Sequence, residues 1–275
     1  DVYVYATSIE NTNCNDERFF QITIYPLLDL NIQGGIICVN PITGITEQPL
    51  LLNSGLNPAD FTVEWYLNGI LMGTGTTYLA TEAGTYDVVT IKVSAENPPD
   101  CNYNPTSVLV EQSSSAIASV SISEPFDNVA VITVNIENGI GEYIYQLDNG
   151  AFQASNQFYN VSSGEHIITV RDIFGYCGDF ILTATVIKYP KYFTPNGDGA
   201  NETWNIFDLA IDHPESIISI FDRYGKLIKQ ISPIGTGWDG TFNGKKLPST
   251  DYWFNVNYIY EGQEKIFRAH FSLIR

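Results

Sequence analysis

Short segments in which apolar and polar residues alternate recur along the whole chain. Residues 61–67 read Phe-Thr-Val-Glu-Trp-Tyr-Leu, and Asn68-Gly69 separates them from a second apolar segment. An Asn-Gly pair between two such segments favours a type I′ hairpin, because both central residues of that turn have positive φ. Tyr, Val, Ile, Thr and Phe fit a pleated sheet, and clusters of Gly, Asn, Pro and Ser interrupt them. The pattern predicts an all-β fold of short antiparallel strands joined by turns.

The end of the chain shows the alternation most clearly. Residues 218–231 fit a hairpin that turns at Tyr224-Gly225, and apolar residues occupy every second position from 254 to 260. In residues 267–273, Phe, Ala, Phe and Leu share one face of a strand, while Arg, His and Ser share the other. Residues 190–275 are therefore predicted to form a small antiparallel β-sandwich of about seven strands.

The charge of the chain excludes some functions. The formal net charge is −18, from 31 acidic and 13 basic residues, and such a chain repels nucleic-acid phosphates and anionic lipid headgroups. The acidic residues have two interpretations, which are solubility and binding of calcium, a cation that prefers carboxylate and carbonyl oxygens. Because no segment of about 18 apolar residues occurs, we expect no direct insertion into a membrane by a helix.

Turns, polar loops and an internal repeat divide the chain into four predicted parts. Residues 3–24 and 86–110 share the order of strand, polar loop with a cysteine, and second strand. Because residues 1–5 already read as a strand, we expect a longer protein to precede them. The predicted parts are 1–31, the end of a preceding module; 32–115, a β-sandwich module; 116–189, a second β module; and 190–275, a C-terminal domain.

Four cysteines, at 14, 38, 101 and 177, are widely spaced in the chain. None forms a C-x-x-C pair and the three histidines lie far away in sequence, which disfavours a zinc site. Wide spacing in an all-β chain is typical of disulfides in an oxidising compartment. The sequence does not give the connectivity. Cys14 has two candidate partners, a residue upstream of this chain or Cys38, and Cys177 has no partner within its own predicted module.

The module at 32–115 resembles bacterial immunoglobulin-like (Ig-like) surface modules. Cys38, Trp65 and Cys101 bracket it, and a Gly-Thr-Tyr segment begins at residue 84. The chain departs from the antibody pattern, because Trp65 lies too far after Cys38 and Val88 stands at the place of the second antibody cysteine. The resemblance implies tandem Ig-like β-sandwich modules, of which 1–31 is the end of one, and a disulfide between Cys38 and Cys101.

The module at 116–189 resembles the short repeats of SprB-type gliding adhesins of Bacteroidota. Residues 143–148 read Tyr-Ile-Tyr-Gln-Leu-Asp, Phe-Gln follows at 152–153, and residues 164–172 run from Gly to a Val-Arg-Asp ending before Gly175 and Cys177. The resemblance covers about 45 residues and implies that this module belongs to an adhesive stalk.

The last part carries several motifs in order. Residues 190–204 contain Pro-Lys-Tyr-Phe-Thr-Pro-Asn-Gly-Asp-Gly and end in Trp204, residues 220–228 read Ile-Phe-Asp-Arg-Tyr-Gly-Lys-Leu-Ile, and Trp-Asp-Gly follows at 238–240. Over its whole length, 190–275 resembles the gliding-motility-associated C-terminal domain, the type B sorting domain of the type IX secretion system. The resemblance implies a secreted surface protein of Gram-negative Bacteroidota. An outer-membrane β-barrel of the PorP/SprF type would hold it.

A sorting domain needs an accessible surface or edge strand for its partner. We expect this surface to combine the last strand, ending at Arg275, with the loop between Phe193 and Trp204. The predicted contact residues are Phe193, Thr194, Pro195, Trp204, Phe267, Phe271, Leu273 and Arg275.

The loop at 194–202 also has two interpretations. Asn196, Asp198 and Glu202 match three positions of a calcium-binding loop, although Thr194 stands where the first carboxylate belongs. Alternatively, the loop is a tight turn in which Asn and Asp side chains bond the backbone and two glycines supply positive φ. We therefore expect no cofactor other than, at most, calcium.

No catalytic motif is present, so no enzyme activity is predicted. The histidines lack a nucleophile motif nearby, and aromatic clusters such as 252–254 are more typical of a sandwich core than of a sugar site. The sequence thus favours the sorting and anchoring region of a gliding adhesin. The alternative is the non-catalytic tail of a secreted hydrolase that carries the same sorting domain.

Overall fold

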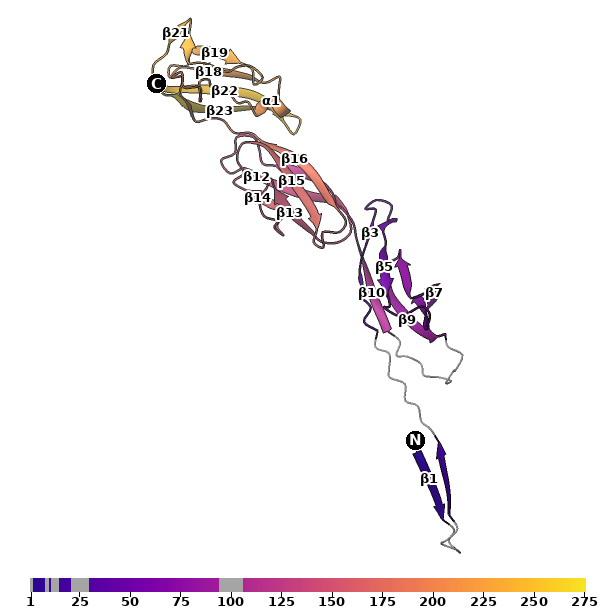
Figure 1. Ribbon diagram of the computed structural model, residues 1–275. Coiled ribbons are helices and arrows are strands. Elements are labelled where there is room, and N and C mark those ends of the chain that lie inside the picture. The colour runs from indigo at the N-terminus through magenta and orange to yellow at the C-terminus, as the bar shows by residue number, and fades with distance from the viewer. Residues whose placement is uncertain (1, 8–9, 11–14, 21–29, 94–105) are drawn as a thin grey trace. The chain divides into compact units, whose positions relative to one another are not determined.

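The computed structural model describes residues 2–7, 10, 15–20, 30–93 and 106–275, and β-strands account for most of it (Figure 1). In these residues the one α-helix is the short α1 (Leu209–Asp212), so the predicted all-β fold is confirmed. None of the described residues forms a helix with the length and hydropathy of a membrane span. The chain forms two compact units. The first comprises residues 1–36 and 49–111, and the second comprises residues 37–48 and 112–275.

The first unit contains a hairpin and two sheets. β1 and β2 pair antiparallel, β5 pairs with β8, and β10, β9, β6 and β7 are neighbours in a larger sheet. Trp65 and Tyr86 are fully buried in its core. The Asn-Gly hairpin is confirmed, because Asn68 has φ 52° and Gly69 has φ 79° between β6 and β7. The strands are β1 (Val2–Thr7), β2 (Asn15–Phe20), β5 (Leu50–Asn53), β6 (Phe61–Leu67), β7 (Ile70–Thr74), β8 (Thr77–Ala80), β9 (Gly84–Lys92) and β10 (Thr106–Ser113).

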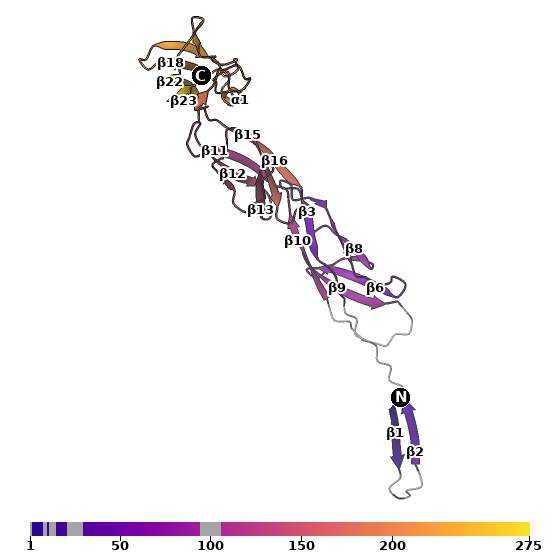
Figure 2. The same cartoon turned by 60° about the vertical axis from the view of Figure 1, so that its left-hand side comes forward.

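The division between the two units falls within β3 and within β10. The second unit begins with the rest of β3 and its antiparallel partner β4. Two three-stranded sheets follow, β11-β12-β14 and β13-β15-β16, whose strands are labelled in Figures 1 and 2. Their inward residues, including Ile132, Val134, Ile168 and Val170, form one core. The strands are β3 (Gly35–Val39), β4 (Thr46–Gln48), β11 (Ile117–Ile122), β12 (Val131–Asn138), β13 (Tyr143–Leu147), β14 (Gln157–Tyr159), β15 (Gly164–Asp172) and β16 (Asp179–Val186).

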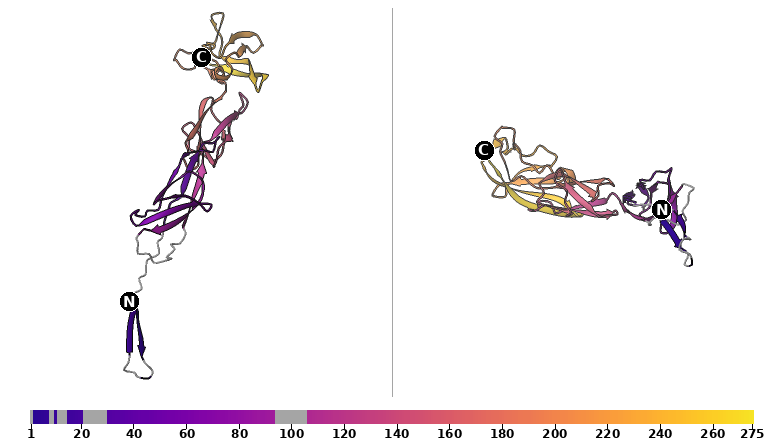
Figure 3. Two further views of the ribbon diagram at one scale, coloured as in Figure 1. Left: turned by 90° about the vertical axis from the view of Figure 1, so that its right-hand side faces the viewer. Right: turned by 60° about the horizontal axis from the view of Figure 1, so that its bottom comes forward.

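Residues 187–275, here called the C-terminal domain, contain seven strands. Five form the sheet β17-β23-β22-β18-β19, and β20 pairs with β21. The β22–β23 hairpin, the long yellow strands in Figure 3, pairs Thr250 with Leu273 at one end and Tyr260 with Gln263 at the other. The predicted hairpin of residues 218–231 is confirmed as β18 and β19. The strands are β17 (Tyr192–Phe193), β18 (Ile217–Phe221), β19 (Leu227–Ile231), β20 (Thr241–Phe242), β21 (Lys245–Lys246), β22 (Thr250–Tyr260) and β23 (Gln263–Leu273).

The core of the C-terminal domain includes a residue that precedes the domain in sequence. Phe126, from the segment between β11 and β12, is buried among the residues of this core, as is Ile187. The Phe126 N–H donates to the Ile187 carbonyl at 2.9 Å. The C-terminal domain and the sandwich before it therefore share buried contacts within one compact unit.

Candidate functional site

The C-terminal domain packs its aromatic residues into a dense core. Trp204 stacks on Phe271 with ring centroids 3.7 Å apart and 8° between the ring planes, and Phe193 lies beside Trp238. The Trp204 indole N–H donates to the Pro190 carbonyl at 2.8 Å, which satisfies the polar atom of this buried side chain.

This packing corrects part of the predicted partner surface. Phe193, Trp204, Phe271 and Leu273 are each 1% exposed or less, so their side chains stabilise the fold and are not available to a partner. Phe193 of β17 and Phe271 and Leu273 of β23 lie on the inward face because alternate residues of a strand point to the core. Trp204 lies outside the strands and stacks on Phe271.

The other four predicted contact residues lie nearer the surface. Thr194 and Pro195 are half-buried at the start of the loop, and Phe267 is half-buried beneath Phe126. Arg275 is exposed; its backbone N–H donates to Ser249 Oγ at 3.0 Å and its guanidinium donates to the Gly240 carbonyl at 3.0 Å. The last residue of the chain thus holds the end of β23 against the turn before β20.

The loop at 194–202 is closed by its own side chains. Glu202 Oε1 accepts the N–H groups of Gly197 at 2.7 Å and Gly199 at 3.0 Å. Asp198 accepts the Ala200 N–H and the Asn196 amide, and these bonds hold the pKa of its carboxyl below the usual value, with the Ala200 N–H as the larger cause. Gly197 and Gly199 both have φ 88°. The geometry is that of the tight turn, in which one oxygen of each carboxylate, Glu202 Oε1 and Asp198 Oδ1, already accepts backbone N–H groups.

Across the described part of the chain, no group of three or more His, Cys, Asp or Glu side chains is placed to hold a metal ion. Calcium binding by Asn196, Asp198 and Glu202 stays one of the two interpretations of this loop, and a calcium titration described in the Discussion tests it.

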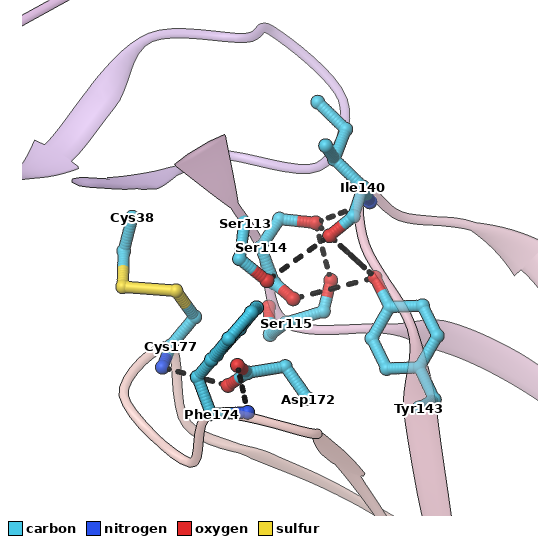
Figure 4. The surroundings of a disulfide bond; sticks show 9 residues. All are labelled: Cys38, Ser113, Ser114, Ser115, Ile140, Tyr143, Asp172, Phe174 and Cys177. Carbon is cyan, nitrogen blue, oxygen red and sulfur yellow. Dashed lines mark hydrogen bonds between the residues drawn. A yellow bond between two sulfur atoms is a disulfide. The ribbon is translucent and has the colours of Figure 1, made fainter. Parts of the chain in front are cut away.

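A disulfide joins Cys38 of β3 to Cys177 in the turn between β15 and β16, with their Cα atoms 5.3 Å apart and a sequence separation of 139 (Figure 4). The predicted pairing of Cys38 with Cys101 is wrong, because Cys38 is already bonded. Cys101 and Cys14 lie outside the described residues. The bond ties β3 to the sandwich of residues 112–186 within the second unit.

A buried carboxylate shapes the turn that presents Cys177. Asp172 has no exposed surface; its two oxygens accept the N–H groups of Phe174 at 3.1 Å and Cys177 at 3.0 Å. Two fully buried serines lie nearby in Figure 4: Ser113 Oγ donates to the Ile140 carbonyl, and Ser114 Oγ accepts the Ile140 N–H. Sequence reasoning missed this network, although an Asp before a Gly-rich turn is a usual sign of such a cap.

A second polar cluster joins β15 to the turn after β13 and to the β14–β15 turn. His166 is buried, and its Nδ1 lies 2.8 Å from Asp148 Oδ2, while Asp148 Oδ1 accepts the Ile167 N–H at 2.9 Å. The imidazole of His166, and to a smaller extent the Ile167 N–H, hold the pKa of the Asp148 carboxyl below its usual value. The Nε2 atom of His166 lies 3.2 Å from the Ser162 carbonyl oxygen. Both ring nitrogens of His166 therefore contact residues in turns, and the cluster stabilises those turns.

Charge is distributed unevenly along the chain. Residues 187–275 contain ten of the 13 basic residues and ten of the 31 acidic residues. The C-terminal domain is thus formally neutral, and the excess negative charge lies before it. A neutral domain with exposed arginines can approach surfaces that would repel the rest of the chain.

The last part of the chain matches a known protein family. Residues 187–273 match the model of the CHU_C type IX secretion signal domain. The C-terminal domain is therefore similar to a domain that directs proteins to the type IX secretion machinery, which implies export and association with the cell surface or outer membrane in Bacteroidota. The match favours a targeting role over a catalytic role for this region.

Comparisons with curated proteins and with solved structures do not identify a function. No curated protein matches the chain. Among solved structures, similarity is found to PorZ, an essential surface component of the type IX secretion system of Porphyromonas gingivalis, at 13% identity and TM-score 0.25, covering 98% of this chain and 42% of that chain. Domains 3–5 of Drosophila OTK match at 12% identity and TM-score 0.20, covering 90% of this chain and 97% of that chain. These TM-scores are too low to carry an argument.

Proposed function

We propose that this chain is a sorting and anchoring region of a surface protein exported by the type IX secretion system. The match of residues 187–273 to the secretion signal domain carries the proposal. The β modules before it would form a spacer, since the sandwich of residues 112–186 shares buried contacts with the signal domain. An outer-membrane β-barrel of the PorP/SprF type would retain the exported protein.

The exported protein is proposed to be a gliding adhesin. The motifs at 143–148 and 164–177 support this reading because they resemble adhesin repeats. Sequencing upstream of residue 1 tests it directly. Further repeats of this kind would support an adhesin, whereas a catalytic domain would identify the chain as the tail of a secreted hydrolase.

Export is tested with the chain behind a periplasmic signal peptide, in a Bacteroidota strain with the type IX system and in one without it. The chain should reach the surface, where added protease degrades it, only in the first strain. Removal of residues 187–275 should leave it in the periplasm, whereas removal of residues 1–29, a control truncation at the other end, should not. Equal surface exposure of both truncated chains would contradict the proposal.

A further inference from the structure

The last strand of the C-terminal domain has one long edge without a neighbouring strand. β23 has 11 residues, but β17 pairs only with Ser272 and Leu273. Pro190 explains why the pairing stops: it has no N–H to donate, and its carbonyl accepts the Trp204 indole. In the described structure no other strand lies on this side of β23.

The backbone groups at the open edge can be assigned from the existing hydrogen bonds. The N–H groups of Ser272 and Ile274 donate towards β17, to the carbonyls of Lys191 at 2.9 Å and Phe193 at 3.1 Å. Successive residues of a strand direct their N–H and C=O groups to opposite edges. The N–H and C=O groups of Ile266, Arg268 and His270 therefore face the open edge, while those of Phe267 and Ala269 face β22.

The side chains along this edge define what can lie beside it. Ile266 is 53% exposed, Arg268 is exposed and joins no ion pair within the described residues, and His270 lies 3.9 Å from Asp251. These three side chains share the solvent face. On the other face, Phe267 and Ala269 pack against the core, so a strand added here would meet the Arg268 guanidinium on one face and apolar surface on the other.

A second copy of the chain is a poor occupant of this edge. Antiparallel pairing of two β23 strands about Arg268 would place the two guanidinium groups directly opposite each other, and like charges in opposed positions destabilise a sheet. An acidic strand from another protein has the complementary charge.

We propose that residues 264–270 of β23 are a β-augmentation site for an extended segment of the outer-membrane partner. In this segment apolar residues alternate with Glu or Asp, with an acidic residue opposite Arg268 and the apolar residues beside Phe267. Backbone hydrogen bonds provide the affinity and the alternating side chains provide the selectivity. The identity of the partner rests on the proposed function; the binding mode rests on the edge itself.

The test uses the whole chain and a capped seven-residue peptide, Val-Glu-Val-Glu-Val-Glu-Val, with a fluorescent label. A peptide with Lys in place of Glu is the control. Fluorescence anisotropy should show binding of the acidic peptide and weaker binding of the basic one. NMR hydrogen exchange should show slower exchange at residues 266, 268 and 270 when the acidic peptide is added, with residues 267 and 269 unchanged. Absence of this alternating protection at saturating peptide overturns the proposal.

Two variants separate the backbone contribution from the charge. Arg268→Pro removes an N–H that faces the open edge and leaves the bonds to β22 intact, so the acidic peptide should bind at least about tenfold more weakly. Arg268→Ala removes only the charge and should weaken binding about two- to fivefold. Equal affinity of wild type and Arg268→Pro overturns the proposal. If Arg268→Pro does not fold, as judged by circular dichroism, the exchange measurement on wild type decides.

The result of the peptide-binding test does not depend on the result of the export assay. Loss of export on removal of residues 187–275, together with no peptide protection of β23, would retain the secretion signal and reject the edge as its binding site. Peptide binding to β23 together with export that does not depend on residues 187–275 would retain the edge and reject the proposed function. A dimer of the free chain in size-exclusion chromatography that Arg268→Pro dissociates would show a second copy at this edge and reject the proposal.

Discussion

Phe126 stacks on Phe267 of β23, with ring centroids 4.4 Å apart and 17° between the ring planes. Phe126 also meets the Tyr258 ring edge-on at 5.6 Å and is 7% exposed. Its backbone has φ 72°, a conformation that costs free energy in a bulky residue. Burial of the ring offsets this cost, so a residue outside the family match completes the core of the C-terminal domain.

Replacing Phe126 by Ala should therefore destabilise the C-terminal domain by about 3 kcal/mol, as for other buried Phe residues. Trp204, Trp238 and Trp253 all belong to this domain, so urea unfolding followed by tryptophan fluorescence reports mainly on it. Phe207, which is 53% exposed, is the matched control, and Phe207→Ala should cost under about 0.5 kcal/mol. Equal effects of the two substitutions would show that Phe126 does not belong to the core.

Local features of the fold could be predicted from the sequence, whereas contacts between distant segments could not. The hairpin at Asn68-Gly69 and the face shared by Phe271 and Leu273 follow from turn chemistry and alternation, which involve neighbouring residues. The same alternation marks Phe271 and Leu273 as inward residues, which is why they are unavailable to a partner.

Two contacts that define the second unit had no local signal. Phe126 lies in a short Pro-Phe-Asp segment without periodicity, and its burial depends on where β23 packs. Cys38 and Cys177 are bonded at a sequence separation of 139, and this pairing depends on how β3 and the β15–β16 turn are arranged in space. The open edge of β23 depends on strand order, which the pattern of apolar residues does not specify.

The disulfide gives a prediction that discriminates between the two pairings of Cys38. Mass spectrometry of a non-reduced digest should recover the peptide with Cys38 linked to the peptide with Cys177. Recovery of Cys38 linked to Cys101 would contradict the structure. Because the bond closes a long loop, Cys177→Ala should cost about 2–4 kcal/mol, and Cys38→Ala should add nothing when it is combined with Cys177→Ala.

The loop at 194–202 should depend on Glu202 and not on calcium. Glu202→Ala leaves the N–H groups of Gly197 and Gly199 without their charged acceptor and should cost about 1–2 kcal/mol, while Glu202→Gln keeps one oxygen and should cost less. Isothermal titration with calcium should give no heat of binding, because Glu202 Oε1 and Asp198 Oδ1 already accept backbone N–H groups. A calcium-dependent rise in melting temperature that Glu202→Ala abolishes would instead establish the metal site.

Tyr258 links the pH dependence of stability to the contact between the C-terminal domain and the preceding sandwich. Burial, followed by the hydrogen bond from its hydroxyl to Glu124 Oε1 at 3.2 Å, raises the pKa of Tyr258 from 10.0 to about 12. At pH values between 10.0 and about 12, the unfolded chain loses the phenolic proton of Tyr258 and the folded chain keeps it. The unfolded state then binds fewer protons, so the free energy of unfolding falls as pH rises.

The contribution of Tyr258 is thus fully present below pH 10 and is lost as pH rises towards about 12. The Tyr258→Phe side chain cannot ionise in the folded or the unfolded chain, so this variant should lose less stability than wild type between pH 9 and pH 11.5. It lacks the hydrogen bond to Glu124 at both pH values, so that loss does not change the comparison. Urea unfolding of the two proteins at each pH measures the difference. Tyr159, which is 61% exposed, provides the control, because Tyr159→Phe should follow the wild-type profile. Parallel losses in wild type and Tyr258→Phe would mean that the Tyr258 hydroxyl ionises equally in the folded and unfolded chain, and that its contact with Glu124 does not protect it.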